Sequence, residues 1–249
     1  MGQRSGHERP GRLVGASEYE FVVREFEPIY DRLVEQLEPR PGERWLDVAT
    51  GTGEIAVRAA RAGAEVTGID LAPAMIEHAR SHPEPVRWEV GDVQELPYAD
   101  GAFDVVSSNF GAVCAPDAER TAAELTRVCR GRLGLTAWEH HPEREIWDRH
   151  SEEIRLPELW ASEEQIRELL PAFELEIERR TWYLEGASFE LIWEWVARAF
   201  PPHRERVLRM GPEQIEAVRH EIAELYERHR PNGVIRYPRP YLLAVGAKR

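Results

Sequence analysis

The stretch LDVATGTGEIA, residues 46–56, decides the fold. Its first residues are typical of a short buried strand, Gly51 and Gly53 indicate a tight turn, and the apolar residues that follow recur at helical spacing. The run EVTGID, residues 65–70, is predicted to be a second strand. In doubly wound sheets, ligands bind beyond the carboxyl ends of such strands. The glycine loop and Asp70 are therefore expected to line one crevice.

The charges around this loop indicate which ligand the crevice holds. The spacing GTGEIA, residues 51–56, also satisfies a loose dinucleotide fingerprint, so spacing alone does not decide. Asp47 ends the first strand and Glu54 begins the helix, and both would repel a pyrophosphate, which favours bare N–H groups at a helix start. A nucleoside with an ammonium and a sulfonium centre would be attracted instead, and Asp70 could accept hydrogen bonds from its ribose.

At this point the sequence resembles the class I S-adenosylmethionine-dependent methyltransferases. LDVATGTG is similar to the first motif of that family, with Ala49 in place of its first glycine. GIDLAPAMIEHAR (68–80) resembles the second strand and helix, and VGDVQELPYADGAFDVVSSNFGAV (90–113) resembles the third and fourth motifs. The resemblance covers roughly residues 40–140. More loosely, the whole chain is similar to bacterial small-molecule methyltransferases with a helical insert near the C-terminus.

The resemblance implies a site for S-adenosyl-L-methionine at the strand ends. It implies that Asp92 binds the adenine amino group and that Val93 and Leu71 pack on the adenine ring. Asn109 and Phe110, beyond the fourth strand, would contact the cofactor or the acceptor. The expected cofactor-binding residues are Asp47, Ala49, Thr50, Gly51, Gly53, Asp70, Leu71, Met75, Asp92, Val93, Asn109 and Phe110.

The expected fold is a single α/β domain over residues 17–249. It has a Rossmann-like, doubly wound, mostly parallel seven-stranded sheet, an antiparallel last strand and a helical lid insert. Apolar runs predict further strands at 86–90, 103–107, 133–138, 173–184 and 241–247. The expected parts are a disordered tail (1–16), capping helices (17–38), a cofactor-binding core (43–138), and helical acceptor-side segments (139–172 and 185–237).

Two local features are also predicted. The alternation of apolar residues in the strand 173–184 changes phase near Arg179, which indicates a bulge. The related family has a longer Pro-Gly-Gly turn before the fifth strand, whereas this chain has Gly131 between two arginines. Gly131 is therefore expected to end the preceding helix with a positive φ.

Composition excludes several classes of function. A chain of 249 residues, 42% of them hydrophobic, can bury one large core. The net charge of −13 gives no global attraction for nucleic acid or an anionic membrane, and it suits small neutral or cationic acceptors. No run reaches the roughly 20 apolar residues of a membrane span, and the first residues lack the apolar region of a secretion signal. A cytoplasmic location is expected, with Cys114 and Cys129 as small buried hydrophobic residues.

Methyl transfer is an in-line displacement, so it requires positioning above all, plus a base when the acceptor carries a proton. His140 and His141 follow the fifth strand and are candidate bases. Six of the eight tryptophans lie from Trp138 onward. Among them, Trp147 and Trp195 are candidate pocket walls, which would favour a planar or hydrophobic acceptor. The acidic and histidine residues nearby lack the spacing of a metal site.

The leading interpretation is an S-adenosylmethionine-dependent methyltransferase acting on a small molecule. A nicotinamide-dependent oxidoreductase could use the same β-α-β unit, although the chain has no Tyr-x-x-x-Lys signature. A non-catalytic S-adenosylmethionine-binding protein stays open as well, because catalysis by positioning requires no obligatory base. The acceptor, the choice of oxygen, nitrogen or carbon as methylated atom, and the oligomeric state are not predicted.

Overall fold

The computed structural model describes residues 25–151, 160–199 and 201–249, which form a seven-stranded sheet in the order β3-β2-β1-β4-β5-β7-β6. Strands β1 to β5 run parallel, and β7 runs antiparallel to both β5 and β6. The strand order reverses between β1 and β4, which is the topological switch point of a doubly wound sheet. The predicted fold class is confirmed.

The elements have the following bounds. The strands are β1 (Arg44–Val48), β2 (Glu65–Asp70), β3 (Arg87–Val90), β4 (Phe103–Asn109), β5 (Cys129–Trp138), β6 (Phe173–Gly186) and β7 (Ile235–Lys248). The helices are α2 (Glu27–Leu37), α3 (Glu54–Arg61), α4 (Pro73–Ala79), α5 (Ala118–Val128), α6 (Pro142–His150), α7 (Glu163–Leu169), α8 (Phe189–Ala199), α9 (Pro201–Arg209) and α10 (Pro212–Glu227). Two short 3-10 helices are η1 (Ala112–Cys114) and η2 (Pro231–Gly233).

Local sequence explains where several helices begin. The Asp117 carboxylate accepts from the backbone N–H of Arg120 at 2.9 Å at the start of α5, and the Ser162 hydroxyl accepts from that of Gln165 at 3.2 Å at the start of α7. Proline occupies the first turn of α2, α4, α6 and α10, where its missing N–H costs no helical hydrogen bond.

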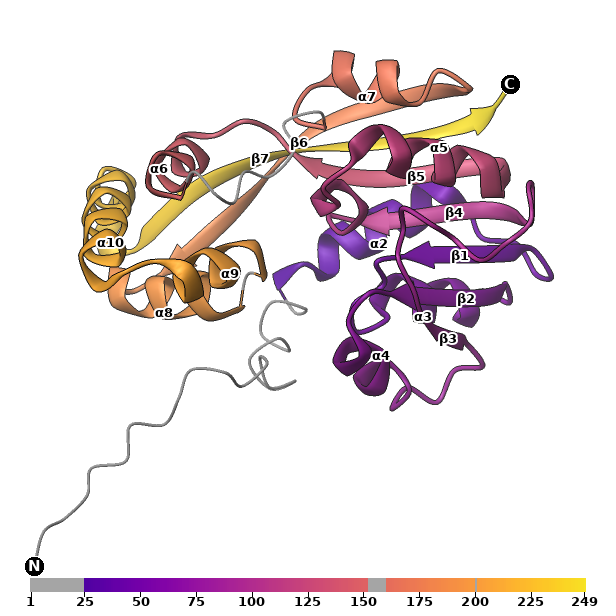
Figure 1. The fold of residues 1–249 in the computed structure, drawn as a ribbon, viewed down its shortest axis with the longest axis horizontal. Coiled ribbons are helices and arrows are strands. Elements are labelled where there is room, and N and C mark those ends of the chain that lie inside the picture. Colours follow the sequence, from indigo (N-terminus) through magenta and orange to yellow (C-terminus); the bar gives the residue numbers. More distant parts are fainter. Residues whose placement is uncertain (1–24, 152–159, 200) are drawn as a thin grey trace, which may run out of the picture.

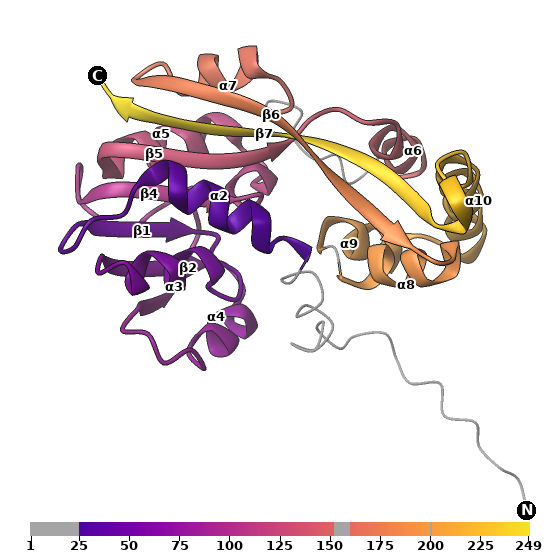
Figure 2. The same ribbon diagram turned by 180° about the vertical axis from the view of Figure 1, so that it is seen from behind.

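The two faces of the sheet carry separate hydrophobic cores. Face A includes Trp45 and Val105, and helices α2 and α3 cover it. Face B includes the neighbouring residues Leu46 and Val106 and is covered by α5 and α7. Figure 1 shows the sheet with α5 in front, and Figure 2 shows it with α2 in front. Burial on both faces is what continuous apolar strands such as β4 require.

Strands β6 and β7 run on beyond the end of β5 as a two-stranded ribbon (Figure 1). The helices α6, α8, α9 and α10 lie at the far part of this ribbon, and we call these four helices the lid. Helix α7 instead packs against α5 on face B. Within the described residues of the predicted acceptor-side segment 139–172, α6 therefore lies with the lid and α7 does not.

The predicted bulge near Arg179 is wrong. The pairing of β6 with β7 is continuous from Phe173 opposite Lys248 to Gly186 opposite Ile235. The buried residues nevertheless change from odd to even numbers along β6. They do so because α7 covers face B over the first half of the strand, whereas the core on face A, with α8, covers the second half.

The predicted helix stop at Gly131 is also wrong. Helix α5 ends at Val128 and β5 begins at the next residue, so Gly131 lies inside the strand and has no positive φ. A Cβ at Gly131 would collide with the backbone carbonyl oxygen of Asp104, beside the register shift between β4 and β5. Glycine is thus required here for close approach of two strands rather than for a turn.

Other predictions concern single residues or segments. Cys129 is buried as predicted, but Cys114 is exposed because η1 places it on the surface. The predicted tail, 1–16, and residues 17–24 of the capping segment lie outside the described residues. Helix α2 is the described part of that segment and packs on face A. None of the described helices combines the length and hydropathy that crossing a membrane would require.

A buried ion pair joins the lid to the ribbon. Glu143 on α6 and Arg239 on β7 are 0% and 1% exposed, and Arg239 donates to both carboxylate oxygens of Glu143. The Tyr226 hydroxyl on α10 accepts from the same guanidinium at 3.3 Å. Although burial opposes ionisation, the charge of Arg239 holds the pKa of Glu143 at about 2. The pair therefore stays ionised at neutral pH.

Aromatic stacking joins three of the lid helices. The Trp147 ring on α6 is fully buried and lies parallel to two other rings. Its centroid is 4.5 Å from that of His203 on α9 and 5.8 Å from that of Trp193 on α8. The lid is thus packed around stacked aromatic rings, and its buried residues are continuous with the hydrophobic core on face A.

We expect Glu143→Gln to lower the free energy of unfolding by about 3–5 kcal/mol, because it leaves a buried guanidinium without its anionic partner. Glu145→Gln is the matched control, since Glu145 lies on the same helix but is exposed, and it should cost less than about 0.5 kcal/mol. Urea denaturation of the wild type and the two variants measures both changes in the free energy of unfolding. Equal stabilities of the two variants would contradict the assigned role of the pair.

Candidate functional site

The carboxyl ends of β1, β2, β3 and β4 lie at one edge of the sheet, because these neighbouring strands are parallel. Three aspartates, Asp47, Asp70 and Asp92, lie at or just after the ends of the first three strands, and Asn109 ends the fourth. The structure thus brings the predicted polar residues to one edge, at the switch point between β1 and β4.

The loop after β1 turns sharply because several of its residues are left-handed. Ala49, Gly51 and Gly53 have φ values of 51°, 56° and 95°. A Cβ on Gly53 would collide with the Trp88 ring of β3. Ala49 packs against Gly111, which has no space for a Cβ of its own. The loops after β1 and β4 therefore touch, and the missing side chains let them do so.

Asp70 joins the loops after β1 and β2. Its Oδ2 accepts from the backbone N–H of Gly51 at 2.8 Å, and its Oδ1 accepts from that of Ala72 at 2.8 Å. Burial raises the pKa of this half-buried carboxyl. Each carboxylate oxygen can accept a further hydrogen bond. Asp70 can therefore hold the loop and bind hydroxyl groups of a ligand at the same time.

Asp47 lies beneath the glycine loop and is only 1% exposed. Its carboxylate accepts from the hydroxyls of Thr50 and Ser107, the latter at 2.7 Å, and the indole N–H of Trp45 donates to Ser107 at 2.8 Å. Burial raises the pKa of Asp47 to about 7, against the effect of the two hydroxyl donors. Asp47 therefore supports the loop from below and does not lie on the rim of the crevice.

The third strand end combines a carboxylate with apolar side chains. Asp92 Oδ1 accepts from the backbone N–H of Gln94 at 2.8 Å, which fixes a turn after β3. Leu71 is 69% exposed, more than any other large hydrophobic residue that the structure describes. Met75 and Val93 are half-buried. Exposed apolar groups beside carboxylates are suited to a ligand with a flat apolar ring and polar edges.

The fourth strand ends in a hydrogen-bonded chain. The backbone N–H of Phe110 donates to the Thr136 hydroxyl at 2.9 Å, and that hydroxyl donates to Asn109 Oδ1 at 2.8 Å. Phe110 is left-handed, with φ 57°, and its ring stacks on Trp138 at 4.0 Å. The backbone of Phe110 thus lies at the strand ends, while its ring belongs to an aromatic cluster with Trp138 and Tyr241.

The candidate bases and pocket walls lie in different surroundings. His140 is exposed and contacts Glu145 at 2.7 Å. His141 is buried, and burial lowers its pKa to about 4, so it is neutral at pH 7. Trp147 is buried inside the lid, whereas the side chain of Trp195 lies outside what the structure describes.

Sequence reasoning missed Trp88, Ser107 and Thr136. Ser107 and Thr136 hold Asp47 and Asn109, and Trp88 fills the space above Gly53. A signal for Ser107 was present, because it lies two residues before Asn109 in the same strand and therefore on the same face of the sheet.

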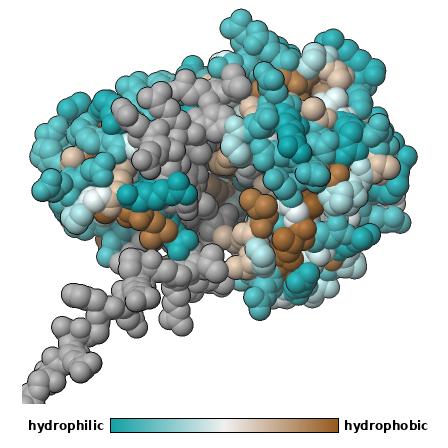
Figure 3. All heavy atoms as spheres, viewed as in Figure 1, coloured by the Kyte–Doolittle hydropathy of each residue, from teal (hydrophilic) through white to brown (hydrophobic). Residues whose placement is uncertain are grey.

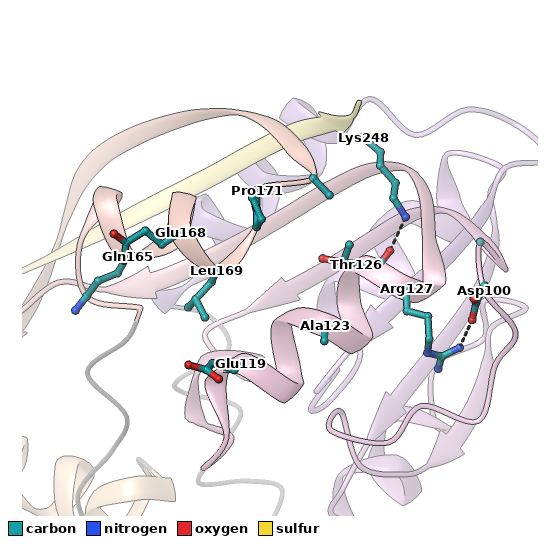
Figure 4. Close-up of a pocket in the computed structure, with 12 residues that line it drawn as sticks. Asp100, Glu119, Ala123, Thr126, Arg127, Gln165, Glu168, Leu169, Pro171 and Lys248 are labelled. Atoms are coloured by element: carbon teal, nitrogen blue, oxygen red, sulfur yellow. Dashed lines mark hydrogen bonds and ion pairs between the residues drawn. The ribbon is translucent and has the colours of Figure 1, made fainter.

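A groove of about 900 Å³ lies between α5 and α7 (Figure 4). It borders the start of β5, so it lies at the amino ends of the parallel strands, opposite the carboxyl ends that carry the aspartates. Its two cationic groups are already engaged: Lys248 donates to the carbonyls of Thr126 and Cys129 at 2.6 and 2.7 Å, and Arg127 pairs with Asp100 at 3.1 Å. Lys248 thereby satisfies carbonyl groups at the end of α5.

Comparisons with known proteins show what the chain is similar to. Residues 46–132 match the family described as "Methyltransferase domain". An uncharacterised protein of Mycobacterium tuberculosis is 41% identical over 105 residues, which cover 40% of this chain and 38% of that protein. The ubiquinone/menaquinone biosynthesis C-methyltransferase UbiE of Ruegeria sp. is 34% identical over 55% of this chain and 62% of its own length. Nocamycin O-methyltransferase of Saccharothrix syringae is 36% identical over 45% of this chain and 43% of its own length.

Solved structures show the same fold. A putative methyltransferase from Bacillus halodurans has a TM-score of 0.66 at 21% identity, over 88% of this chain and 98% of that one. Phosphoethanolamine N-methyltransferase 2 of Haemonchus contortus, solved with S-adenosyl-L-methionine, has a TM-score of 0.62 at 18% identity, over 94% of this chain and 56% of that one. Residues 46–132 thus match a methyltransferase domain, and the chain has the fold of the class I S-adenosylmethionine-dependent methyltransferases. The match spans less than two thirds of each curated relative named above.

The raised pKa of Asp47 predicts a pH-dependent stability. Between the ordinary carboxyl pKa of 3.8 and about 7, the folded protein holds a proton that the unfolded chain has released, so stability falls as pH rises. Asp47→Asn carries no such proton. We expect its stability relative to the wild type to rise by up to about 1.4 kcal/mol per pH unit between pH 5 and 7. Urea denaturation at several pH values measures this difference, and a constant difference would refute the assignment.

Proposed function

We propose that this chain is an S-adenosylmethionine-dependent methyltransferase that acts on a small-molecule acceptor. The observation that carries the proposal is the carboxylate of Asp70, which is bonded to the N–H groups of Gly51 and Ala72 and has lone pairs left for a ribose. The match to the methyltransferase domain family supports it.

The residues at the strand ends fit such a cofactor. Asp70 would accept from the two ribose hydroxyls, Leu71, Met75 and Val93 would pack on the adenine, and Asp92 would accept from the adenine amino group. The loop of residues 49–53 would surround the amino-acid part of the cofactor, with Asp47 beneath it. When bound, the cofactor supplies a methyl group activated by a sulfonium centre. The residues of this chain supply the orientation that an in-line displacement requires.

The charge distribution also supports a ligand without phosphates. Asp70 and Asp92 are half-buried carboxylates beside the glycine loop, and a diphosphate there would be repelled. Glu54, at the start of α3, forms an ion pair with Arg58 at 2.6 Å. The repulsion therefore depends on the two strand-end aspartates more than on the helix start.

We propose a small, planar or hydrophobic acceptor that binds between the strand ends and the lid. The aromatic cluster of Phe26, Phe110, Trp138, Trp182 and Tyr241 lies between these two parts. Figure 3 shows hydrophobic patches on both the sheet half and the lid half of a mostly hydrophilic surface. The net charge of −13 disfavours nucleic acid and anionic membranes as partners. We also propose one domain over residues 17–249 and a cytoplasmic location.

A screen with radiolabelled cofactor tests this function. Protein freed of carried-over ligand would be incubated with methyl-labelled S-adenosylmethionine and a panel of small metabolites. We expect a labelled product from at least one acceptor. Cofactor binding with no product from any acceptor would favour the binding-protein alternative, and absence of binding in isothermal titration would refute the whole proposal.

Asp70→Asn should weaken binding of S-adenosylhomocysteine by about 30-fold, on the order of 2 kcal/mol, because charge-assisted hydrogen bonds are lost. Asp100→Asn is the control, since Asp100 lies beside the remote groove. Isothermal titration of the two folded variants gives both affinities. An unchanged affinity in Asp70→Asn would remove Asp70 from the cofactor site.

A further inference from the structure

We propose that Asn109 presents its amide NH₂ group to the acceptor, and that the acceptor is therefore an oxygen compound: a phenol, an enol or a related acid whose oxygen carries negative charge. The methyl group goes to that oxygen or to a carbon conjugated with it, and not to an amine. This inference rests on the proposed methyltransferase function.

Hydrogen bonding fixes which way the Asn109 amide faces. The backbone N–H of Phe110 can only donate, so the Thr136 hydroxyl accepts from it, at 2.9 Å. The single hydrogen of that hydroxyl is then free to donate, and Asn109 Oδ1 lies at 2.8 Å. The hydroxyl has no other acceptor among the described residues. The carbonyl side of the amide must therefore face Thr136, and the NH₂ side must face away from it.

The position of Asn109 directs this NH₂ group to the crevice. Asn109 is the last residue of β4, the strand next to β1 at the switch point. Ser107, two residues earlier, contacts Asp47 directly, so Asn109 lies on the same face of the sheet as Asp47. The side chain is half-buried, and its NH₂ group has no hydrogen-bond partner within the described parts of the chain. Two oriented donors are thus present at the edge of the cofactor site.

The neighbouring residues make these donors more effective. Thr136 and Trp138 are alternate residues of β5 on the same face as Asn109, and Trp138 is stacked on Phe110. An apolar wall beside a hydrogen-bond donor excludes water and strengthens the bond to an anionic oxygen. A flat ring that carries an oxygen matches this combination of an aromatic wall and an amide donor.

The chemistry of the transfer distinguishes oxygen from nitrogen acceptors. An oxygen acid enters the step as its anion, after releasing its proton to solvent. A lone pair of the anion forms the new bond to the methyl carbon, the carbon–sulfur bond breaks, and its electron pair stays on sulfur as a neutral thioether. One N–H of the Asn109 amide can donate to the anionic oxygen and stabilise it before transfer. This local donor acts against the net charge of −13, which favours acceptors that are neutral when they first bind. An amine has N–H groups that require acceptors, and the Asn109 NH₂ group offers none.

Asn109→Asp tests the proposal, because it keeps the shape of the side chain and replaces the donor with a charged acceptor. With S-adenosylhomocysteine present, 4-nitrophenol and 4-nitroaniline form a matched pair of probes whose absorbance reports binding and ionisation. We expect the wild type to bind 4-nitrophenol as the phenolate and to lower its pKa, and Asn109→Asp to lose this shift with at least a 10-fold weaker affinity. Affinity for S-adenosylhomocysteine should change less than 3-fold.

Asn232→Asp is the matched control, since Asn232 is exposed in the turn before β7 and Asp tolerates its φ of 53°. Its binding of both probes should equal that of the wild type. Thr136→Val provides a second variant, because it removes the hydroxyl that orients the amide. In ¹⁵N-labelled protein, the Asn109 side-chain amide signals should shift on adding 4-nitrophenolate to the wild type and should respond less in Thr136→Val.

A methyl-transfer assay completes the test. It compares phenols and cyclic 1,3-diketones with anilines and benzylamines of the same ring size. Transfer to the oxygen compounds, with a pH profile of kcat that Asn109→Asp moves to higher pH, supports the proposal. It is overturned by transfer to the amines only, by no binding of 4-nitrophenol to the wild type, or by a 10-fold loss of S-adenosylhomocysteine affinity in Asn109→Asp. The last result would assign Asn109 to the cofactor, and failure of cofactor binding in the wild type would instead reject the proposed function.

Discussion

The two hydrogen bonds from the backbone to the Asp70 carboxylate hold the site together. They tie the turn after β1 to the turn after β2, so the shape of the glycine loop depends on a side chain from the neighbouring strand. From below, the Asp47 carboxylate is bonded to the hydroxyls of Thr50 and Ser107, which ties the same loop to β4. The strands adjoining β1 are therefore connected at their carboxyl ends by side-chain carboxylates, in addition to the ladder of backbone hydrogen bonds.

The sequence alone predicted the sheet well because its signals are local and repeated. The glycine loop, the acidic residues after successive strands and the apolar β4 all follow from periodicity and turn chemistry. The change of phase in β6 was misinterpreted, since a bulge and a change in the covering helices produce the same pattern of residues. Gly131 was misinterpreted for a similar reason: glycine serves both turns and close strand contacts, and only the position of Asp104 in space distinguishes them.

The site was predicted less completely than the fold. The sequence placed Asp47 in the crevice by its position at a strand end, but its burial depends on Ser107, 60 residues later. Likewise, the orientation of the Asn109 amide depends on Thr136, which is 27 residues away and is brought beside it by the pairing of β4 and β5. Such pairs are determined by strand register, and a single sequence does not show which residues face each other across two strands.

The ribbon of β6 and β7 has a mechanical consequence. The strands pass without interruption from the core to the lid. The distance between the two halves is therefore set by the backbone hydrogen bonds between these strands, which contain no flexible linker. Any displacement of α8 or α10 along this connection requires the whole ladder to twist. An acceptor bound between the two halves, as proposed above, would accordingly be selected by size, because a hydrogen-bonded sheet fixes their spacing.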